Sequence, residues 1–229
     1  MEKYWFLSTA DIFNKLPEDE RAFFYRKSFR RKYSKKSIIF SPGNQESLIY
    51  YILNGKVKIY SLSKLGKEVI HWFRYPNEFF GLAEACCGEA RTVFAEAAED
   101  TEVLCINRSD FENLIRKSSQ FALCIIEILA RRIRQAHGTI KDLAVYDVRS
   151  RLIQVLVNLC HICGLSNRGS IAIEGRLTHE EIARMIGATR TTVTEIMNEF
   201  KKERLIKYNR NKITILNYRR LAGLIEPPD

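Results

Sequence analysis

The segment of residues 177–206, LTHEEIARMIGATRTTVTEIMNEFKKERLI, constrains the fold of this chain more than any other. Thr178 stands three residues before Glu181, which is the spacing of a capping box at the start of a helix. Gly187 can adopt the left-handed turn that ends a helix. Thr189 then provides a hydroxyl that can cap a second helix. The segment therefore predicts two short helices joined by a tight turn.

The second of these helices has two distinct faces. Its apolar residues recur at spacings of three and four, as on the buried side of a helix: Val193, Ile196, Met197 and Phe200. A polar set would then lie on the solvent-facing side: Arg190, Thr191, Thr194, Glu195 and Asn198. Two helices of this kind are typical of a helix-turn-helix, although ordinary helical hairpins can produce the same pattern.

A wing is predicted directly after these helices. Residues 207–216, KYNRNKITIL, contain a turn candidate at 209–211 followed by the alternating Ile213 and Ile215. Basic residues of this strand pair could reach DNA phosphates, which provide most of the sequence-independent affinity: Lys207, Arg210 and Lys212. Together, the helices and the wing favour DNA binding.

The same region resembles the DNA-binding half of the superfamily of the cyclic-AMP receptor protein and the fumarate-and-nitrate-reduction regulator. The matching residues are Leu177-Thr178-x-x-Glu181-Ile182-Ala183, Gly187-Ala188-Thr189-Arg190, Thr192-Val193 and Leu205-Ile206. The resemblance implies that Arg190 reads guanine through O6 and N7. It also implies phosphate contacts by Thr178, Thr189 and Thr192. Thr191 and Glu195 stand where the family often has Glu and Arg, so we expect a different half-site.

The composition indicates a globular protein with an ample core. The 229 residues are 46% hydrophobic and 28% charged, and no apolar run approaches the length needed to span a bilayer. The start has no signal-peptide pattern, so we expect a cytoplasmic protein without membrane contact. The net charge of +10 favours a polyanionic partner. A basic stretch, residues 26–36, is interpreted as a solvated face, with a contact to DNA or polymerase as the alternative.

The six cysteines should be reduced in such a protein. Cys160 and Cys163 form a lone CxxC pair, whereas a structural zinc site needs four ligands. We therefore expect buried thiols and no metal site.

The N-terminal half predicts an antiparallel β sandwich or barrel, preceded by two short helices within residues 9–28. Asn54-Gly55 is a strong hairpin signal and leads into an alternating strand at 57–60. Further short β-rich runs are separated by turn residues: Ser37–Phe40, Leu48–Leu53, Val69–Arg74, Thr92–Ala97 and Val103–Ile106. The family resemblance extends to Leu53–Tyr60 and identifies the barrel as a cyclic-nucleotide-binding jelly roll.

A long helix is predicted over residues 109–144. Its apolar residues follow a heptad seam: Ala122, Ile126, Leu129, Ile133, Ala136, Ile140 and Leu143. Such a repeat predicts pairing with the same helix of a second copy, and the alternative is packing against the chain's own barrel. A two-fold dimer would match DNA half-sites one turn apart. Asp147 then resembles an N-cap, which makes residues 146–147 a hinge candidate.

The resemblance also locates an effector site, in Glu78-Phe79-Phe80-Gly81 and Arg91-Thr92-Val93. In cyclic-AMP-binding members, Arg and a hydroxyl bind the phosphate and a Glu after the Gly binds the ribose. Here Gly81, Arg91 and Thr92 match, but Leu82 replaces that Glu, and Glu84 is displaced by two residues. On the long helix, Ala136 and His137 replace two hydroxyl residues. We therefore expect a nucleotide-like effector other than cyclic AMP.

Other effectors known in the superfamily need other residues. Its iron–sulfur sensors use N-terminal cysteines, and no cysteine precedes Cys86. Haem could use His71 or the pair Cys86–Cys87 as an axial ligand, and the same pair could act as a thiol switch. A single histidine on an alternating strand is more often a satisfied structural residue. No cofactor follows from the sequence alone.

These observations predict a homodimeric transcription regulator of the α+β class that contacts DNA and RNA polymerase. Its parts would be a sensory jelly roll at 1–108, a dimerisation helix and hinge at 109–146, and a winged helix-turn-helix at 147–229. A jelly-roll metalloenzyme would need paired histidines, and the four histidines (71, 137, 161 and 179) are scattered. A nucleotide-binding module without DNA binding is the remaining alternative, and it has no use for residues 177–206.

Overall fold

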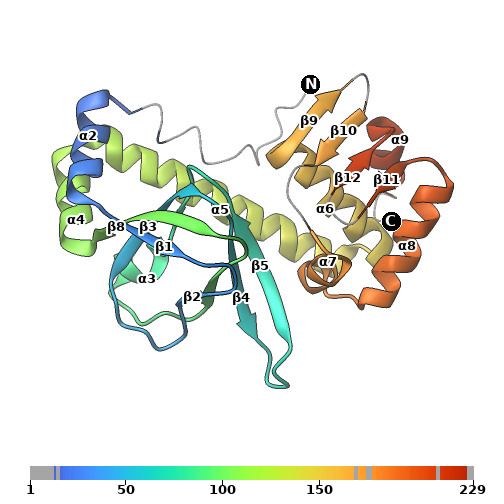
Figure 1. Cartoon of the computed structure of the whole chain (residues 1–229), viewed down its shortest axis with the longest axis horizontal. Coiled ribbons are helices and arrows are strands. Elements are labelled where there is room, and N and C mark those ends of the chain that lie inside the picture. The colour runs from blue at the N-terminus through green and yellow to red at the C-terminus, as the bar shows by residue number, and fades with distance from the viewer. Residues whose placement is uncertain (1–12, 14–15, 168–169, 174–176, 210–211, 226–229) are drawn as a thin grey trace. The chain divides into compact units, whose positions relative to one another are not determined.

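The computed structural model describes residue 13 and residues 16–167, 170–173, 177–209 and 212–225 (Figure 1). The chain divides into two compact units, one formed by Ser8–Arg132 and the other mainly by Ile133–Asp229. None of the helices in the described ranges combines the length and apolar character that crossing a bilayer requires. The predicted α+β class is confirmed, with antiparallel sheets in the first unit and a helix-turn-helix in the second.

Two four-stranded antiparallel sheets form the N-terminal unit. The first has the order β1 (Phe29–Tyr33), β8 (Thr101–Asn107), β3 (Leu48–Asn54) and β6 (Phe79–Phe80). The second has the order β2 (Ile38–Phe40), β7 (Phe94–Ala97), β4 (Val57–Leu62) and β5 (Glu68–Arg74). The sequence did not predict β1 or the two-residue β6. Each is short and gains its partner from a strand far along the chain.

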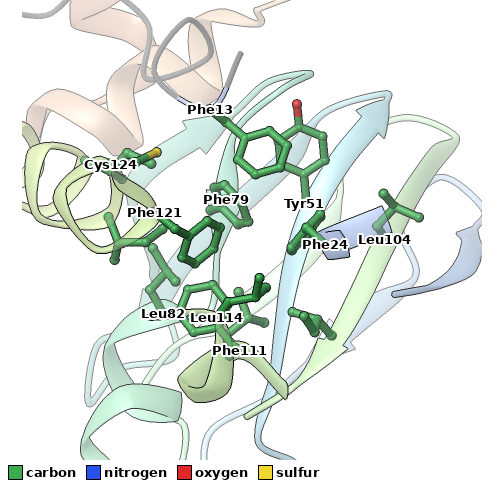
Figure 2. Packing of buried hydrophobic residues seen from close by; sticks show 14 of the residues in the cluster. Phe13, Phe24, Tyr51, Phe79, Leu82, Leu104, Phe111, Leu114, Phe121 and Cys124 are labelled. Carbon is green, nitrogen blue, oxygen red and sulfur yellow. The ribbon is translucent and has the colours of Figure 1, made fainter. Parts of the chain in front are cut away.

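The central strands of the first sheet, β8 and β3, are buried on both faces. Along β3, Tyr50 and Ile52 belong to a core cluster with residues of the second sheet, whereas Ile49 and Tyr51 belong to a cluster with the helices. The helices of that second cluster are α2 (Glu18–Lys27), α3 (Leu82–Cys87), α4 (Arg108–Lys117) and α5 (Ser119–Val145). Aromatic rings dominate it in edge-to-face contacts (Figure 2). The first helix predicted within residues 9–28 lies largely outside the described residues.

The predicted hairpin at Asn54-Gly55 is wrong. The turn exists, since Gly55 has a φ of +93°, but β3 and β4 do not pair, because they belong to different sheets. A Cβ at Gly55 would lie 2.6 Å from the carbonyl oxygen of Asp100. The glycine therefore allows the chain to cross closely from one sheet to the other. The Asn54-Gly55 sequence determines the turn, but the pairing of β3 and β4 is determined by strands that are distant in the sequence.

The single helix predicted over residues 109–144 is two helices, α4 and α5. Ser118 between them has an extended backbone, and its Oγ accepts a hydrogen bond of 2.9 Å from the amide of Phe121. A serine favours this local bond over an uninterrupted helix. The break leaves α5 with 27 residues, which still include the whole predicted heptad seam.

The second unit combines helices with a four-stranded sheet of order β11-β12-β10-β9. Its helices are α6 (Val148–Cys163), α7 (His179–Ile186), α8 (Arg190–Lys202) and α9 (Tyr218–Ala222). Its strands are β9 (Gly164–Asn167), β10 (Ser170–Ile173), β11 (Ile206–Tyr208) and β12 (Ile213–Ile215). The start of α6 agrees with the prediction, because Asp147 Oδ1 accepts a 2.8 Å bond from the amide of Ser150. This bond lowers the pKa of the Asp147 carboxyl.

Candidate nucleic-acid interface and effector site

The turn between α7 and α8 is built by the local bonds that the sequence predicts. The hydroxyl of Thr178 accepts from the amide of Glu181 at 3.1 Å, and the Glu181 carboxylate accepts from the amide of Thr178 at 2.7 Å. Gly187 ends α7 in the left-handed region at a φ of +66°. The Thr189 hydroxyl accepts from the amide of Thr192 at 3.2 Å and begins α8. Both helix starts are therefore capped by side chains.

The two faces of α8 agree with the predicted division. The four predicted apolar residues are all buried in the core of the unit: Val193, Ile196, Met197 and Phe200. Four of the predicted contact residues are exposed on the other side: Arg190, Thr191, Glu195 and Asn198. Thr192 and Thr194 are half-buried, and Thr178 and Thr189 cap the helix starts. The predicted set therefore lies at the start of α7, at the start of α8 and along α8.

Some of these polar residues are held in place by neighbours. Thr194 donates to the carbonyl of Arg190 at 2.8 Å and lies 2.9 Å from Nδ1 of His179. Asn198 accepts a 2.8 Å bond from the hydroxyl of Tyr208 on the wing strand β11. Burial and the positive charge of Arg190 lower the pKa of His179. His179 therefore helps to position the Thr194 hydroxyl. The sequence pattern did not indicate this role.

The wing is confirmed as the antiparallel pair of β11 and β12, in which Lys207 lies opposite Thr214. The amide of Asn209 bonds to the carbonyl of Lys212 at 3.0 Å, while Arg210 and Asn211 lie outside the described residues. The sheet is larger than predicted, because β12 also pairs with β10.

Two arginines of α6 brace the helix-turn-helix, and neither was predicted. Arg149 forms ion pairs with Glu199 on α8 and with Glu203, the C-cap of α8, and lies 4.8 Å from the ring of Phe200. Arg151 donates to the carbonyl of Ile186, the last residue of α7, at 3.0 Å. These contacts fix α7 and α8 on α6. A helical pattern alone does not reveal them, because they join residues about 35–50 positions apart.

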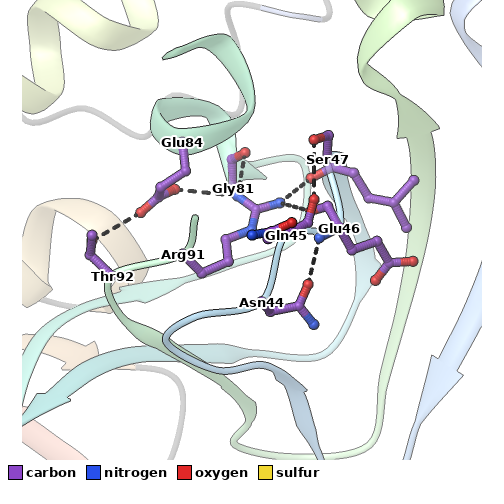
Figure 3. A network of polar contacts seen from close by, with 9 residues as sticks. Asn44, Gln45, Glu46, Ser47, Gly81, Glu84, Arg91 and Thr92 are labelled. Atoms are coloured by element: carbon purple, nitrogen blue, oxygen red, sulfur yellow. Dashed lines mark hydrogen bonds and ion pairs between the residues drawn. The ribbon is translucent and has the colours of Figure 1, made fainter. Parts of the chain in front are cut away.

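In the N-terminal unit, Arg91 is enclosed by protein groups (Figure 3). Its side chain is 1% exposed and forms an ion pair of 3.2 Å with Glu84. It also donates to the carbonyls of Gly81 at 2.8 Å and Glu46 at 3.2 Å, and to that of Leu48. The hydroxyl of Thr92 donates to the other carboxylate oxygen of Glu84 at 3.2 Å. Four of the predicted effector residues therefore lie together, and the Arg91 guanidinium is bound by groups of the protein itself: Gly81, Glu84, Arg91 and Thr92.

This arrangement explains what the displaced glutamate does. Glu84 is the third residue of α3, the helix that begins after Gly81, and this position brings its carboxylate to the Arg91 guanidinium. Gly81 has a φ of +72°, and a Cβ there would lie 3.0 Å from the Arg91 guanidinium. Gly81 therefore allows the left-handed turn and also leaves room for the Arg91 guanidinium that pairs with Glu84. Ala136 and His137, the other predicted effector residues, lie on the part of α5 that belongs to the second unit.

The predicted dimer seam carries large apolar side chains on the surface of the single chain. Exposed fractions are 59% for Ile126, 57% for Ile133, 64% for Ile140 and 50% for Leu143. Leu129 and Ala136 are half-buried. A different stripe of α5, including Phe121 and Ile128, packs into the aromatic core.

The geometry gives little support to a haem ligand at His71 or a thiol switch at Cys86–Cys87. His71 is exposed on β5 and lies 3.0 Å from the hydroxyl of Ser61, so its ring has a protein partner. Cys86 and Cys87 are exposed as residues. The Cys86 thiol is nevertheless partly desolvated, and this desolvation raises its pKa. A redox switch needs the opposite shift, since the thiolate is the reactive form. Of the CxxC pair, Cys160 is buried, and the Cys163 side chain lies outside the described residues.

Comparison with known proteins assigns each unit to a class. The family described as the cyclic nucleotide-binding domain matches residues 30–118, and the Crp-like helix-turn-helix domain matches residues 150–224. Fold and site thus define a DNA-binding transcription regulator with an effector-binding domain. The chain belongs to the CRP/FNR superfamily.

Similarity to individual members extends over most of the chain. The global nitrogen regulator of Nostoc sp. is 29% identical over 80% of this chain and 83% of its own length. The CRP-like cAMP-activated global transcriptional regulator of Mycobacterium tuberculosis is 27% identical over 80% and 82%. The structure of a CooA mutant from Carboxydothermus hydrogenoformans superposes with a TM-score of 0.80 at 25% identity, covering 96% of both chains.

Proposed function

We propose that the protein is a homodimeric, sequence-specific transcription regulator whose DNA affinity is controlled by an effector sensed in the N-terminal unit. The observation that carries this proposal is the outer face of α8, where Arg190, Thr191, Glu195 and Asn198 are exposed beside a capped turn. Exposed polar groups at the N-terminal end of such a helix suit base edges in the major groove. Neighbouring hydroxyls suit phosphates. Binding to DNA would take place in the cytoplasm, with RNA polymerase as a further partner.

The dimer is supported by the seam on α5. Four large apolar residues that are at least half exposed along one stripe would be costly to leave in water. Pairing with the same stripe of a second copy would bury them and would relate the two α8 helices by a two-fold axis.

We expect Ile140→Glu to convert the dimer to a monomer. Each subunit would lose a buried isoleucine, worth about 1.5–3 kcal/mol, and would place a charge in the seam. Sedimentation at micromolar concentration would measure the change. Leu65→Glu is the matched control, because Leu65 is 96% exposed in the β4–β5 turn and lies outside the seam. A dimer that survives Ile140→Glu unchanged would contradict the assignment of the seam.

The effector proposal is that cyclic AMP is not the ligand. Arg91 is already paired with Glu84 and donates to three carbonyls, so binding a cyclic phosphate there would require breaking a buried ion pair. Relatives named as cAMP-activated include the M. tuberculosis regulator, but the Leu82 and Glu84 arrangement argues for a different ligand here.

The test of the DNA function is selective binding. Purified protein should retain a duplex selected from random sequence at far higher affinity than unselected DNA, and both affinities should weaken steeply with salt. A nucleotide-binding module without DNA function would retain neither.

A further inference from the structure

A hydrogen bond between two side chains joins the outer face of α8 to the wing. The hydroxyl of Tyr208 on β11 donates to Oδ1 of Asn198 at 2.8 Å. Tyr208 is half-buried, whereas Asn198 is exposed. An asparagine amide has an oxygen that accepts hydrogen bonds and an NH2 group that donates them. Because Tyr208 bonds to the oxygen, the group that Asn198 presents to a ligand is the NH2 donor.

The ring of Tyr208 is itself held by both helices of the helix-turn-helix. The ring of His179, the first residue of α7, lies edge-on to it, with the centroids 5.1 Å apart. Nζ of Lys201, in the last turn of α8, lies 5.4 Å from the centroid of the Tyr208 ring. His179 is fixed in turn, because its Nδ1 lies 2.9 Å from the hydroxyl of Thr194. The amide of Asn198 is therefore oriented by a ring with contacts on α7 and α8, as a preorganised contact requires.

Asn198 lies away from the end of α8 that is expected to read bases. Arg190 is the first residue of the helix and Asn198 is the ninth. At roughly 1.5 Å per residue, the two are about 12 Å apart along the helix axis. Recognition helices contact base edges with their N-terminal residues. Asn198 is thus placed beside the wing and beyond the base-reading turn.

The charges beside Asn198 differ on its two sides. Residues three and four positions apart are neighbours on a helix surface. Toward the C-terminus these neighbours are the exposed cations Lys201–Lys202, and toward the N-terminus they include the exposed Glu195. The adjacent Glu199 is paired with Arg149 of α6. A donor next to two lysines suits an anionic acceptor, and the acceptors of this kind on DNA are the phosphate oxygens.

We propose that Asn198 donates to a backbone phosphate of DNA and that Tyr208 is the positioning residue that holds its amide in this orientation. The inference rests on the proposed DNA-binding function and specifies the chemical group that this part of α8 contacts. An asparagine that reads adenine must accept and donate at the same base, and the bond from Tyr208 disfavours this arrangement. Asn198 therefore adds affinity for any sequence, while Arg190 selects the base.

The first test removes the donor and keeps the bond to Tyr208. Asn198→Asp retains an oxygen for the Tyr208 hydroxyl, but it loses the NH2 group and adds a negative charge. Fluorescence anisotropy on the full-length protein measures its affinity for a selected and for an unselected duplex. Both affinities should fall by the same factor, on the order of 10-fold to 100-fold. A loss confined to the selected duplex would indicate a base contact and would overturn the proposal, as would unchanged affinity for both duplexes.

The second test addresses the positioning role of Tyr208. Tyr208→Phe keeps the ring and removes the hydroxyl, so both affinities should fall by roughly 3-fold to 10-fold. In an Asn198→Ala background the same change should have no further effect, because Tyr208 acts through Asn198. A purely structural hydroxyl would lower the unfolding midpoint and leave DNA affinity unchanged, and that result would overturn the positioning role. An equal loss of affinity in both backgrounds would overturn it as well.

The matched control is Tyr218→Phe, which removes another tyrosine hydroxyl of the same unit. That hydroxyl lies 2.9 Å from Nε2 of His161 on α6, so its loss should leave both DNA affinities native. If the wild-type protein retains DNA with a steep salt dependence while Asn198→Asp and Tyr208→Phe behave like it, this inference alone fails. If the wild-type protein retains neither duplex, the proposed DNA-binding function fails, and this inference fails with it.

Discussion

Replacing Arg190 with alanine should abolish sequence-specific DNA binding and leave the fold intact. Arg190 is exposed at the first position of α8, and the bond that its backbone carbonyl accepts from the Thr194 hydroxyl would remain in an alanine variant. A bidentate contact of arginine with a base is worth about 1–3 kcal/mol, and a dimer would lose two of them. The affinity for a selected duplex should therefore fall by roughly 30-fold to 10⁴-fold.

The matched variant for Arg190→Ala is Lys207→Ala on the wing. Lys207 is exposed opposite Thr214 and is predicted to contact phosphate. Its loss should weaken selected and random DNA about equally and reduce the salt dependence by about one charge per subunit. Fluorescence anisotropy on both duplexes separates the two patterns, and near-native affinity of Arg190→Ala for the selected duplex would contradict the assigned role.

The second large effect is expected on stability. Arg91→Ala would leave Glu84 as an unpaired, nearly buried charge and would leave the carbonyls of Gly81, Glu46 and Leu48 without their donor. Breaking a buried pair in this way costs about 3–5 kcal/mol. For a protein of this size, each kcal/mol lowers Tm by about 2–4 °C. Calorimetry should therefore record a drop of roughly 6–20 °C for the N-terminal unit.

The control for Arg91→Ala is Arg30→Ala. Arg30 pairs with Glu102 at 3.1 Å on the outer edge of the first sheet, but its side chain is 70% exposed. Exposed pairs contribute about 0–1 kcal/mol, so the midpoint should hardly change. If instead Arg91→Ala kept its stability and lost a response to cyclic AMP, then Arg91 would be a ligand residue rather than a structural one.

The sequence predicted those features that depend on neighbouring residues. The capping box at Thr178, the turn at Gly187 and the cap at Asp147 each join residues about three positions apart, and all of them form. The apolar spacing of α8 likewise located its buried side correctly.

Features that depend on distant partners were missed. Asn54-Gly55 makes a turn, but the strands on either side pair with β8 and β7 instead of with each other. The ion pair of Arg91 with Glu84 does not follow from the sequence pattern, because it depends on the position of α3 in the folded unit. Arg149 and Arg132 have no local signal, because the groups that they contact lie about 50 positions away.

The central claim is that a symmetric dimer reads DNA through α8. Selection from random duplexes, followed by footprinting of the bound sites, tests it most directly. We expect two inverted half-sites whose centres lie about one helical turn, roughly 10 base pairs, apart, with Arg190→Ala altering one base position in each half. Enrichment of a single unpaired site, or no enrichment above random DNA, would contradict the account.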